Sequence, residues 1–97
     1  MTVLVYGLGR SGLAVCRLLQ KQGHTVLAYD AKPKEAELIE LKTLGAHFIE
    51  SPATAKAEIC IAAPGVPYNH ADLLALRKDN IETIGEVEWV YRSIDAT

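Results

Sequence analysis

Short apolar runs alternate along the chain with longer segments in which apolar residues recur every three or four positions. A run of four or five mostly apolar residues that stops at a glycine, aspartate or proline is typical of a strand buried in a parallel sheet. Five such strands are predicted, at Val3–Tyr6, Thr25–Tyr29, Ala46–Ile49, Ile59–Ala63 and Ile81–Ile84.

Apolar spacing of three and four positions predicts helices between these strands and after the last one. The predicted helices are Ser11–Gln22, a segment with Pro33 in its first turn that ends before Gly45, a segment from Asn69 to Lys78, and one that follows Gly85. Asn69 and Asp72 resemble a capping box at the start of the third helix. The last helix carries an apolar stripe formed by Val87, Val90, Tyr91 and Ile94.

Strands that alternate with helical segments are typical of βαβ units, whose right-handed crossovers place helices on both faces of a parallel sheet. We therefore expect an α/β, three-layer, Rossmann-like fold with a five-stranded parallel sheet in the order 3-2-1-4-5. Residues 1–97 are expected to form one domain. In such sheets ligands bind beyond the carboxyl ends of the strands, here where the first and fourth strands lie side by side.

The composition limits the classes of protein to which this chain can belong. With 97 residues, 49% of them hydrophobic, it can bury one compact core. Ten basic and twelve acidic residues give a net charge of −2, which supplies no general attraction to nucleic acid or anionic membranes. Cys16 and Cys60 lie in apolar runs, where a free, buried thiol acts as a small hydrophobe rather than as a disulfide partner. No signal peptide or membrane span is recognisable. We expect a cytoplasmic monomer that binds neither nucleic acid nor membrane.

The segment Gly7-Leu8-Gly9-Arg10-Ser11-Gly12 matches G-x-G-x-x-G and lies between a buried strand and a helix, as that motif requires. Its first glycine permits the tight turn, the second lets the backbone approach a phosphate, and the third lets the helix pack on the strand. The N–H groups at the helix start then face the anion. Ser11 either donates its hydroxyl to a phosphate or caps the helix, and Arg10 is either a solvated charge or a ligand contact.

Three further segments follow other strands at the same edge of the sheet. Asp30 ends the second strand, where a carboxylate can bind a ribose, although a turn-forming Asp would occupy the same position. Lys32 is either a second ligand contact or a solvated charge. Ala63-Pro64-Gly65-Val66-Pro67 is either a wall of the binding crevice or a rigid structural turn. Gly85-Glu86-Val87-Glu88 places two carboxylates near the fifth strand, with interaction with the helix dipole as their ordinary role.

No catalytic residues and no metal site are expected in this chain. His24, His47 and His70 fall on separate elements without ligand-like spacing, and they are interpreted as ordinary surface or boundary residues. No Ser/His/Asp or Cys/His set gathers around one loop, and Trp89 is interpreted as a packing residue. No exposed apolar stripe or charged patch favours a partner-binding module.

Four motifs, GLGRSG, Asp30, AAPGVP and GEVEW, resemble in their order and spacing the N-terminal domain of the MurD-type Mur ligases, over essentially the whole chain. The resemblance implies a domain that binds the UDP part of UDP-N-acetylmuramoyl-L-alanine. Two positions depart from the family, since Arg10 replaces a frequent apolar residue and Ala31 a common hydroxyl residue. The residues implied in binding are Gly7, Gly9, Arg10, Ser11, Gly12, Asp30, Ala31, Lys32, Ala63, Pro64 and Gly65.

The resemblance also implies an activity that belongs to a longer, three-domain enzyme of peptidoglycan synthesis. In this family ATP phosphorylates the substrate carboxylate and the amine of D-glutamate displaces the phosphate, with Mg²⁺ assisting. The ATP-binding loop lies in a central domain, and no G-x-x-x-x-G-K-[ST] motif occurs in residues 1–97. We therefore expect a non-catalytic N-terminal fragment of the ligase that holds no cofactor itself.

The main alternative is an NAD(P)-binding Rossmann domain of a dehydrogenase or of a ligand-sensing regulator. Such a domain would use the same three glycines and the same Asp30, so the motif by itself does not choose between the two ligands.

Overall fold

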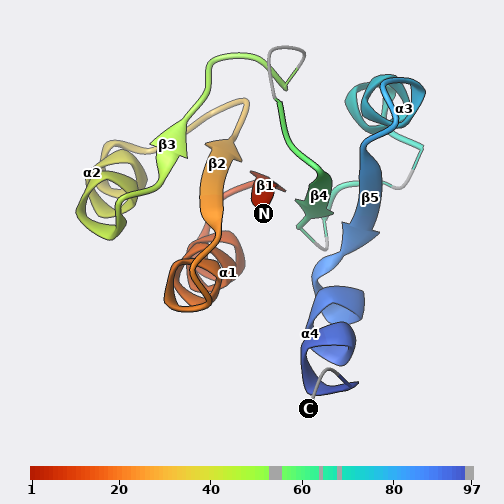
Figure 1. Cartoon of the computed structure of the whole chain (residues 1–97). Helices are drawn as coiled ribbons and strands as arrows, with labels where there is room; N and C mark the ends of the chain where they lie inside the picture. Colours follow the sequence, from red (N-terminus) through yellow and green to blue (C-terminus); the bar gives the residue numbers. More distant parts are fainter. Residues whose placement is uncertain (53–55, 64, 68, 96–97) are drawn as a thin grey trace.

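A computed structural model describes residues 1–52, 56–63, 65–67 and 69–95 (Figure 1). Its strands form one parallel sheet in the order β3-β2-β1-β4-β5, with α1, α2 and α4 on one face and α3 on the other. The expected Rossmann-like fold class and strand order are confirmed. The elements are β1 (Thr2–Tyr6), α1 (Arg10–Lys21), β2 (Thr25–Tyr29), α2 (Glu35–Leu44), β3 (His47–Phe48), β4 (Ile59–Ala62), α3 (Ala71–Lys78), β5 (Glu82–Gly85) and α4 (Glu86–Asp95).

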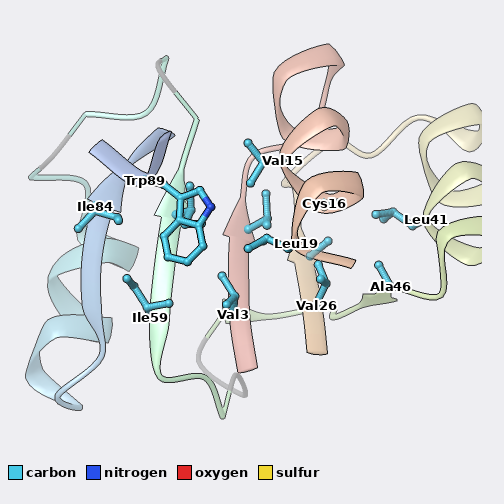
Figure 2. Packing of buried hydrophobic residues seen from close by; sticks show 13 residues of the cluster. Val3, Val15, Cys16, Leu19, Val26, Leu41, Ala46, Ile59, Ile84 and Trp89 are labelled. Carbon is cyan, nitrogen blue, oxygen red and sulfur yellow. The ribbon is translucent and has the colours of Figure 1, made fainter. Parts of the chain in front are cut away.

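The central strand β1 is buried on both faces because successive side chains of a strand project to opposite sides. Val3 and Val5 belong to a core on the face of α1, α2 and α4, which Figure 2 shows in close-up. Leu4 and Tyr6 belong to a second core on the face of α3, where they are buried together with Leu73. The continuous apolar run of this strand therefore reflects two separate cores.

The two cysteines are free and buried on opposite faces of the sheet. Cys16 lies in the core beneath α1, and Cys60 lies in the core beneath α3. Burial raises the pKa of each thiol to about 12, so both stay neutral and act as small apolar side chains. The expectation of unpaired, buried thiols is confirmed.

Two helices begin differently from the sequence-based expectation. The N-cap of α2 is Lys34, and its backbone N–H donates to the Glu37 carboxylate at 2.9 Å, so Pro33 precedes the helix. The N-cap of α3 is His70, whose Nδ1 accepts a hydrogen bond from the Asp72 N–H at 3.1 Å. The predicted capping box that starts at Asn69 is therefore wrong, because the imidazole nitrogen one position later takes the same N–H group.

Helix α4 buries Trp89, as expected for a packing residue, and exposes the predicted apolar stripe. Val87, Val90 and Tyr91 are 67%, 45% and 64% exposed, whereas Trp89 is 8% exposed and packs in the core (Figure 2). Only one face of a helix can meet the sheet, and the large indole offers the most apolar area for burial there. The expectation that the surface has no apolar stripe is thus wrong, and the side chain of Ile94 lies outside the described part of the chain.

Candidate functional site

The turn between β1 and α1 uses backbone conformations that residues other than glycine rarely adopt. Gly7 has φ +98°, and Gly9 has φ +112° with ψ −170°. A Cβ on Gly7 would lie 2.8 Å from the Cβ of Ala63, the first residue after β4. A Cβ on Gly12 would fall against the carbonyl oxygen of Gly7, so the first turn of α1 packs directly on the preceding loop.

The N-terminus of α1 is open to an external anion. Gly9 is its N-cap, no side chain of the described residues caps it, and its first turn contains no acidic residue. A Cβ on Gly9 would meet no atom within 4 Å, so the space in front of this backbone is free. The first N–H groups of a helix point outward and carry partial positive charge, which suits a phosphate. Ser11 is exposed and does not cap the helix, which leaves its hydroxyl for another role.

Asp30 links the end of β2 to the glycine turn. Its Oδ2 accepts a hydrogen bond from the Leu8 N–H, and its Oδ1 accepts one from the Lys32 N–H, both at 2.8 Å. The second bond is the local turn anticipated as the alternative role of this residue. The first bond spans 22 positions of sequence and fixes the glycine turn against β2. Each carboxylate oxygen keeps a further lone pair for a ligand.

The carboxyl ends of β1, β2 and β4 enclose a groove of about 390 Å³ beside the glycine turn. This volume lies within the range of about 300–1,000 Å³ that small ligands occupy in proteins. The groove opens at the position where the sheet reverses its strand order, as expected for this fold. Its lining residues are Tyr6, Gly7, Leu8, Asp30, Ala31, Ala63, Gly65, Val66, Pro67 and His70.

The structure brings together only part of the predicted binding set. Gly7, Asp30, Ala31, Ala63 and Gly65 line the groove. Five other predicted residues lie outside the lining. They are Lys32, which is exposed, and, at the start of α1, Gly9, Arg10, Ser11 and Gly12. The last predicted residue, Pro64, is outside the described residues.

Two lining residues, Tyr6 and His70, were missed from the sequence. Tyr6 is the last residue of β1, and the alternation of that strand places it on the α3 face directly before the glycine turn. This alternation was the signal that could have found it. His70 was interpreted as an ordinary surface or boundary residue, which is incomplete because the start of α3 opens onto the same edge of the sheet as the glycine turn.

The carboxylates that follow β5 belong to a different place. Glu86 and Glu88 lie in the first turn of α4 and do not line the groove. Burial raises the pKa of Glu86, and its Oε2 has no hydrogen-bond partner among the described residues. These side chains occupy the positive end of α4, the ordinary role anticipated for them. Within the described ranges, no three His, Cys, Asp or Glu side chains gather as ligands for a metal ion.

The family of this chain follows from comparison with known sequences. A profile of the MurD-like N-terminal domain of Mur ligases matches residues 1–85. The chain belongs to this family. A UDP-N-acetylmuramoylalanine--D-glutamate ligase from Thermus thermophilus is 44% identical over 89 residues, which cover 92% of this chain and 21% of that enzyme. The ligase of the same name from Caldicellulosiruptor bescii is 40% identical, covering 93% and 21%. The chain thus spans about a fifth of the length of these curated relatives.

Solved structures with a similar fold include other Mur ligases and nicotinamide-dependent enzymes. The murein peptide ligase of Psychrobacter arcticus superimposes with a TM-score of 0.74 at 15% identity, over 87% of this chain and 18% of that protein. The imine reductase of Myxococcus stipitatus in complex with NADP+ gives 0.64 at 17% identity, over 88% and 40%. At such identities the likeness shows the fold alone, and this fold hosts several ligands. The resemblance to MurD-type domains rests instead on the sequence family.

Proposed function

We propose that the glycine turn and the adjoining groove bind the UDP part of UDP-N-acetylmuramoyl-L-alanine. Membership of the MurD-like family supports this ligand. The observation that carries the proposal is the uncapped N-terminus of α1, which Gly9 opens beside a groove formed by the ends of three strands. A diphosphate has the charge for the helix end, and a nucleoside has the size for the groove.

The proposed ligand lies across the glycine turn with its two ends in different surroundings. The diphosphate and the adjoining uridine would contact Gly9, Arg10 and Ser11, where the Arg10 guanidinium adds positive charge to the helix end. The uracil would meet the segment Asp30–Lys32 at the end of β2, and Ala63–Gly65 would form the other wall. Ala31 offers only backbone groups for recognition of the base, since it has no side-chain hydroxyl.

The whole protein is proposed to be a cytoplasmic, monomeric ligase that adds D-glutamate to this substrate with ATP and Mg²⁺, in the synthesis of peptidoglycan. The ligase name of the curated relatives supports this activity. The present chain would supply substrate binding, because its sequence contains no phosphate loop for ATP. None of the helices in the described ranges combines the length and apolarity needed to cross a membrane.

An NMR titration of the chain with UMP and, separately, with NAD tests the ligand. UMP is expected to shift the amide resonances of Gly9, Arg10 and Gly65, with weak affinity because a single domain encloses only part of the substrate. NAD is expected to leave these amides in place. If NAD moves them and UMP does not, the dehydrogenase or regulator alternative replaces the proposal.

Two glycine variants separate a binding effect from a folding effect. Gly9 and Gly23 both have positive φ, and a Cβ at either position would meet no atom within 4 Å. Gly9→Ala and Gly23→Ala should therefore each introduce backbone strain, of about 1–3 kcal/mol. Only Gly9→Ala is expected to abolish the shifts caused by UMP, because Gly23 lies at the opposite end of α1. Equal loss of binding in both variants would contradict the assigned site.

A further inference from the structure

Tyr6, His70 and Asp72 form a connected cluster where the end of β1 meets the start of α3. The hydroxyl of Tyr6, at the end of β1, donates a hydrogen bond to Oδ2 of Asp72 in the first turn of α3. The backbone N–H of Asp72 in turn donates to Nδ1 of His70, and the Tyr6 and His70 rings lie with their centroids 5.8 Å apart. Two of these three side chains, Tyr6 and His70, line the groove.

The hydrogen bond to Nδ1 determines which nitrogen of His70 carries the proton. A ring nitrogen that accepts an N–H bond holds no proton, so the neutral imidazole carries its proton on Nε2. No group of the described residues accepts a hydrogen bond from this Nε2. The side chain is 41% exposed. His70 therefore offers an unused donor at the groove.

Tyr6 is buried and connects the strand before the glycine turn to the start of α3. Its side chain is 7% exposed and packs against the ring of Tyr29 with a centroid distance of 5.3 Å. Burial, and after it the hydrogen bond to Asp72, raises the pKa of Tyr6, so its hydroxyl remains protonated and donates. Because Tyr6 directly precedes Gly7, the bond to Asp72 ties the start of α3 to the strand that leads into the turn.

We propose that His70 is a further ligand-binding residue, which donates a hydrogen bond from Nε2–H to an oxygen of the nucleoside, and that Tyr6 and Asp72 are its positioning residues. The nucleoside is favoured over the diphosphate because His70 shares the groove with Asp30 and Ala31, whereas the first turn of α1 lies outside the lining. This inference rests on the proposed binding of a uridine nucleotide.

The variant His70→Asn distinguishes ligand binding by His70 from a purely structural role as the N-cap of α3. Asn is among the best N-cap residues, so His70→Asn keeps an acceptor for the Asp72 N–H while it removes the Nε2 donor. We expect this variant to unfold at the temperature of the parent and to bind UMP about fivefold more weakly. Its affinity for inorganic pyrophosphate should not change. His47→Asn, at an exposed position of β3, is the matched control for both measurements.

Tyr6→Phe tests the positioning role, because it removes only the hydroxyl that holds Asp72. A two- to threefold weaker affinity for UMP is expected, because the lost free energy of binding should not exceed the net contribution of about one hydrogen bond.

A resonance of the parent chain tests His70 directly. UMP should shift the side-chain ¹⁵N resonance of His70 Nε2, whereas a residue that acts only as a helix cap would show no such shift.

The outcomes separate this inference from the proposed function. If the parent chain does not bind UMP, the proposed function fails, and this inference fails with it. If the parent binds UMP while His70→Asn binds it equally well and the Nε2 resonance stays in place, the inference alone is overturned. Weaker binding of UMP by His70→Asn with unchanged thermal stability supports it.

Discussion

Helices α1 and α4 both follow a parallel strand, yet their first turns differ in the charged side chains that they contain. α1 begins after Gly9 with no side-chain cap and no acidic residue in its first turn. α4 begins directly after β5 and carries Glu86 and Glu88 in its first turn. The same topology therefore produces an open anion site at one helix and a helix end supplied with its own carboxylates at the other.

Helices α2 and α3 resemble α4 because they too carry acidic residues in their first turns. The N-terminal region of α2 has the Glu37 carboxylate, which accepts the Lys34 N–H. At the start of α3 the imidazole of His70 accepts the Asp72 N–H. Among the described helices, α1 is thus the one whose N-terminus has neither a side-chain cap nor an acidic residue in its first turn. A phosphate from a ligand is the group that would complete it.

The largest expected effect comes from adding one methyl group at the close-packed glycine turn. A Cβ on Gly12 would meet the backbone carbonyl of Gly7, which cannot move without disturbing the turn, so Gly12→Ala should lower the free energy of unfolding by about 3 kcal/mol. At the β5–α4 turn, a Cβ on Gly85 would meet nothing within 4 Å, and Gly85→Ala should change stability by less than about 1 kcal/mol. Urea unfolding of both variants measures the difference, and similar losses would contradict the close packing of α1 on its turn.

A smaller effect is expected when α1 is made to resemble α4. Ser11→Asp places a carboxylate in the first turn, which should stabilise the free chain by about 0.3–1 kcal/mol through the helix dipole. The same charge would repel a diphosphate and weaken the affinity for UDP by about tenfold. Calorimetric titration and thermal unfolding measure the two effects. Gln22→Glu adds the same charge at the C-cap of α1 and should reproduce neither effect. Unchanged UDP affinity in Ser11→Asp would show that the anion binds elsewhere.

The smallest effect concerns Glu86, a partly buried carboxylate in the first turn of α4. Burial raises the pKa of Glu86 in the folded chain, so the native state binds this proton more tightly than the unfolded state. The cost of burying the charged form is present at neutral pH and is relieved as the pH falls through the raised pKa. In the parent chain, this cost should lower the free energy of unfolding as the pH rises from about 4.5 to 7. Glu86→Gln should reduce that decrease and raise the free energy of unfolding at pH 7 by less than about 0.5 kcal/mol.

Unfolding by urea at the two pH values checks the predicted flattening. Glu88→Gln, in the same turn but exposed, controls for the loss of a first-turn charge, together with the ion pair that Glu88 forms with Arg92 at 3.6 Å. A parent and a Glu86→Gln variant with the same pH dependence would contradict the account of this side chain.

The comparison of α1 with α4 also shows what the sequence could and could not predict. The run Val3–Tyr6 followed by three spaced glycines predicts the strand, the turn and the helix together, because few other residues fit that backbone. The packing role of Trp89 was predicted from the sequence. The exposure of Val87, Val90 and Tyr91 was missed, because their regular spacing does not show which face of the helix meets the sheet. Helical periodicity identifies faces, whereas the competition between them for the sheet is decided by tertiary packing.

The candidate site was predictable where one element forms it and was missed where several meet. The place of Asp30 at the site was predicted from its position directly after β2. Its hydrogen bond from the Leu8 N–H was not predicted, because it depends on how two loops pack together. The contribution of His70 requires the positions of β1, α3 and the glycine turn in three dimensions. Residues of this kind leave no local pattern of spacing in the chain.

A crystal structure of the chain with UDP tests the central claim most directly. The account predicts the diphosphate at the N-terminus of α1, with phosphate oxygens within about 3 Å of the backbone nitrogens of Arg10 and Ser11 and the uridine in the groove beside Asp30. A diphosphate bound at the first turn of α4, or at any place remote from the glycine turn, would contradict it.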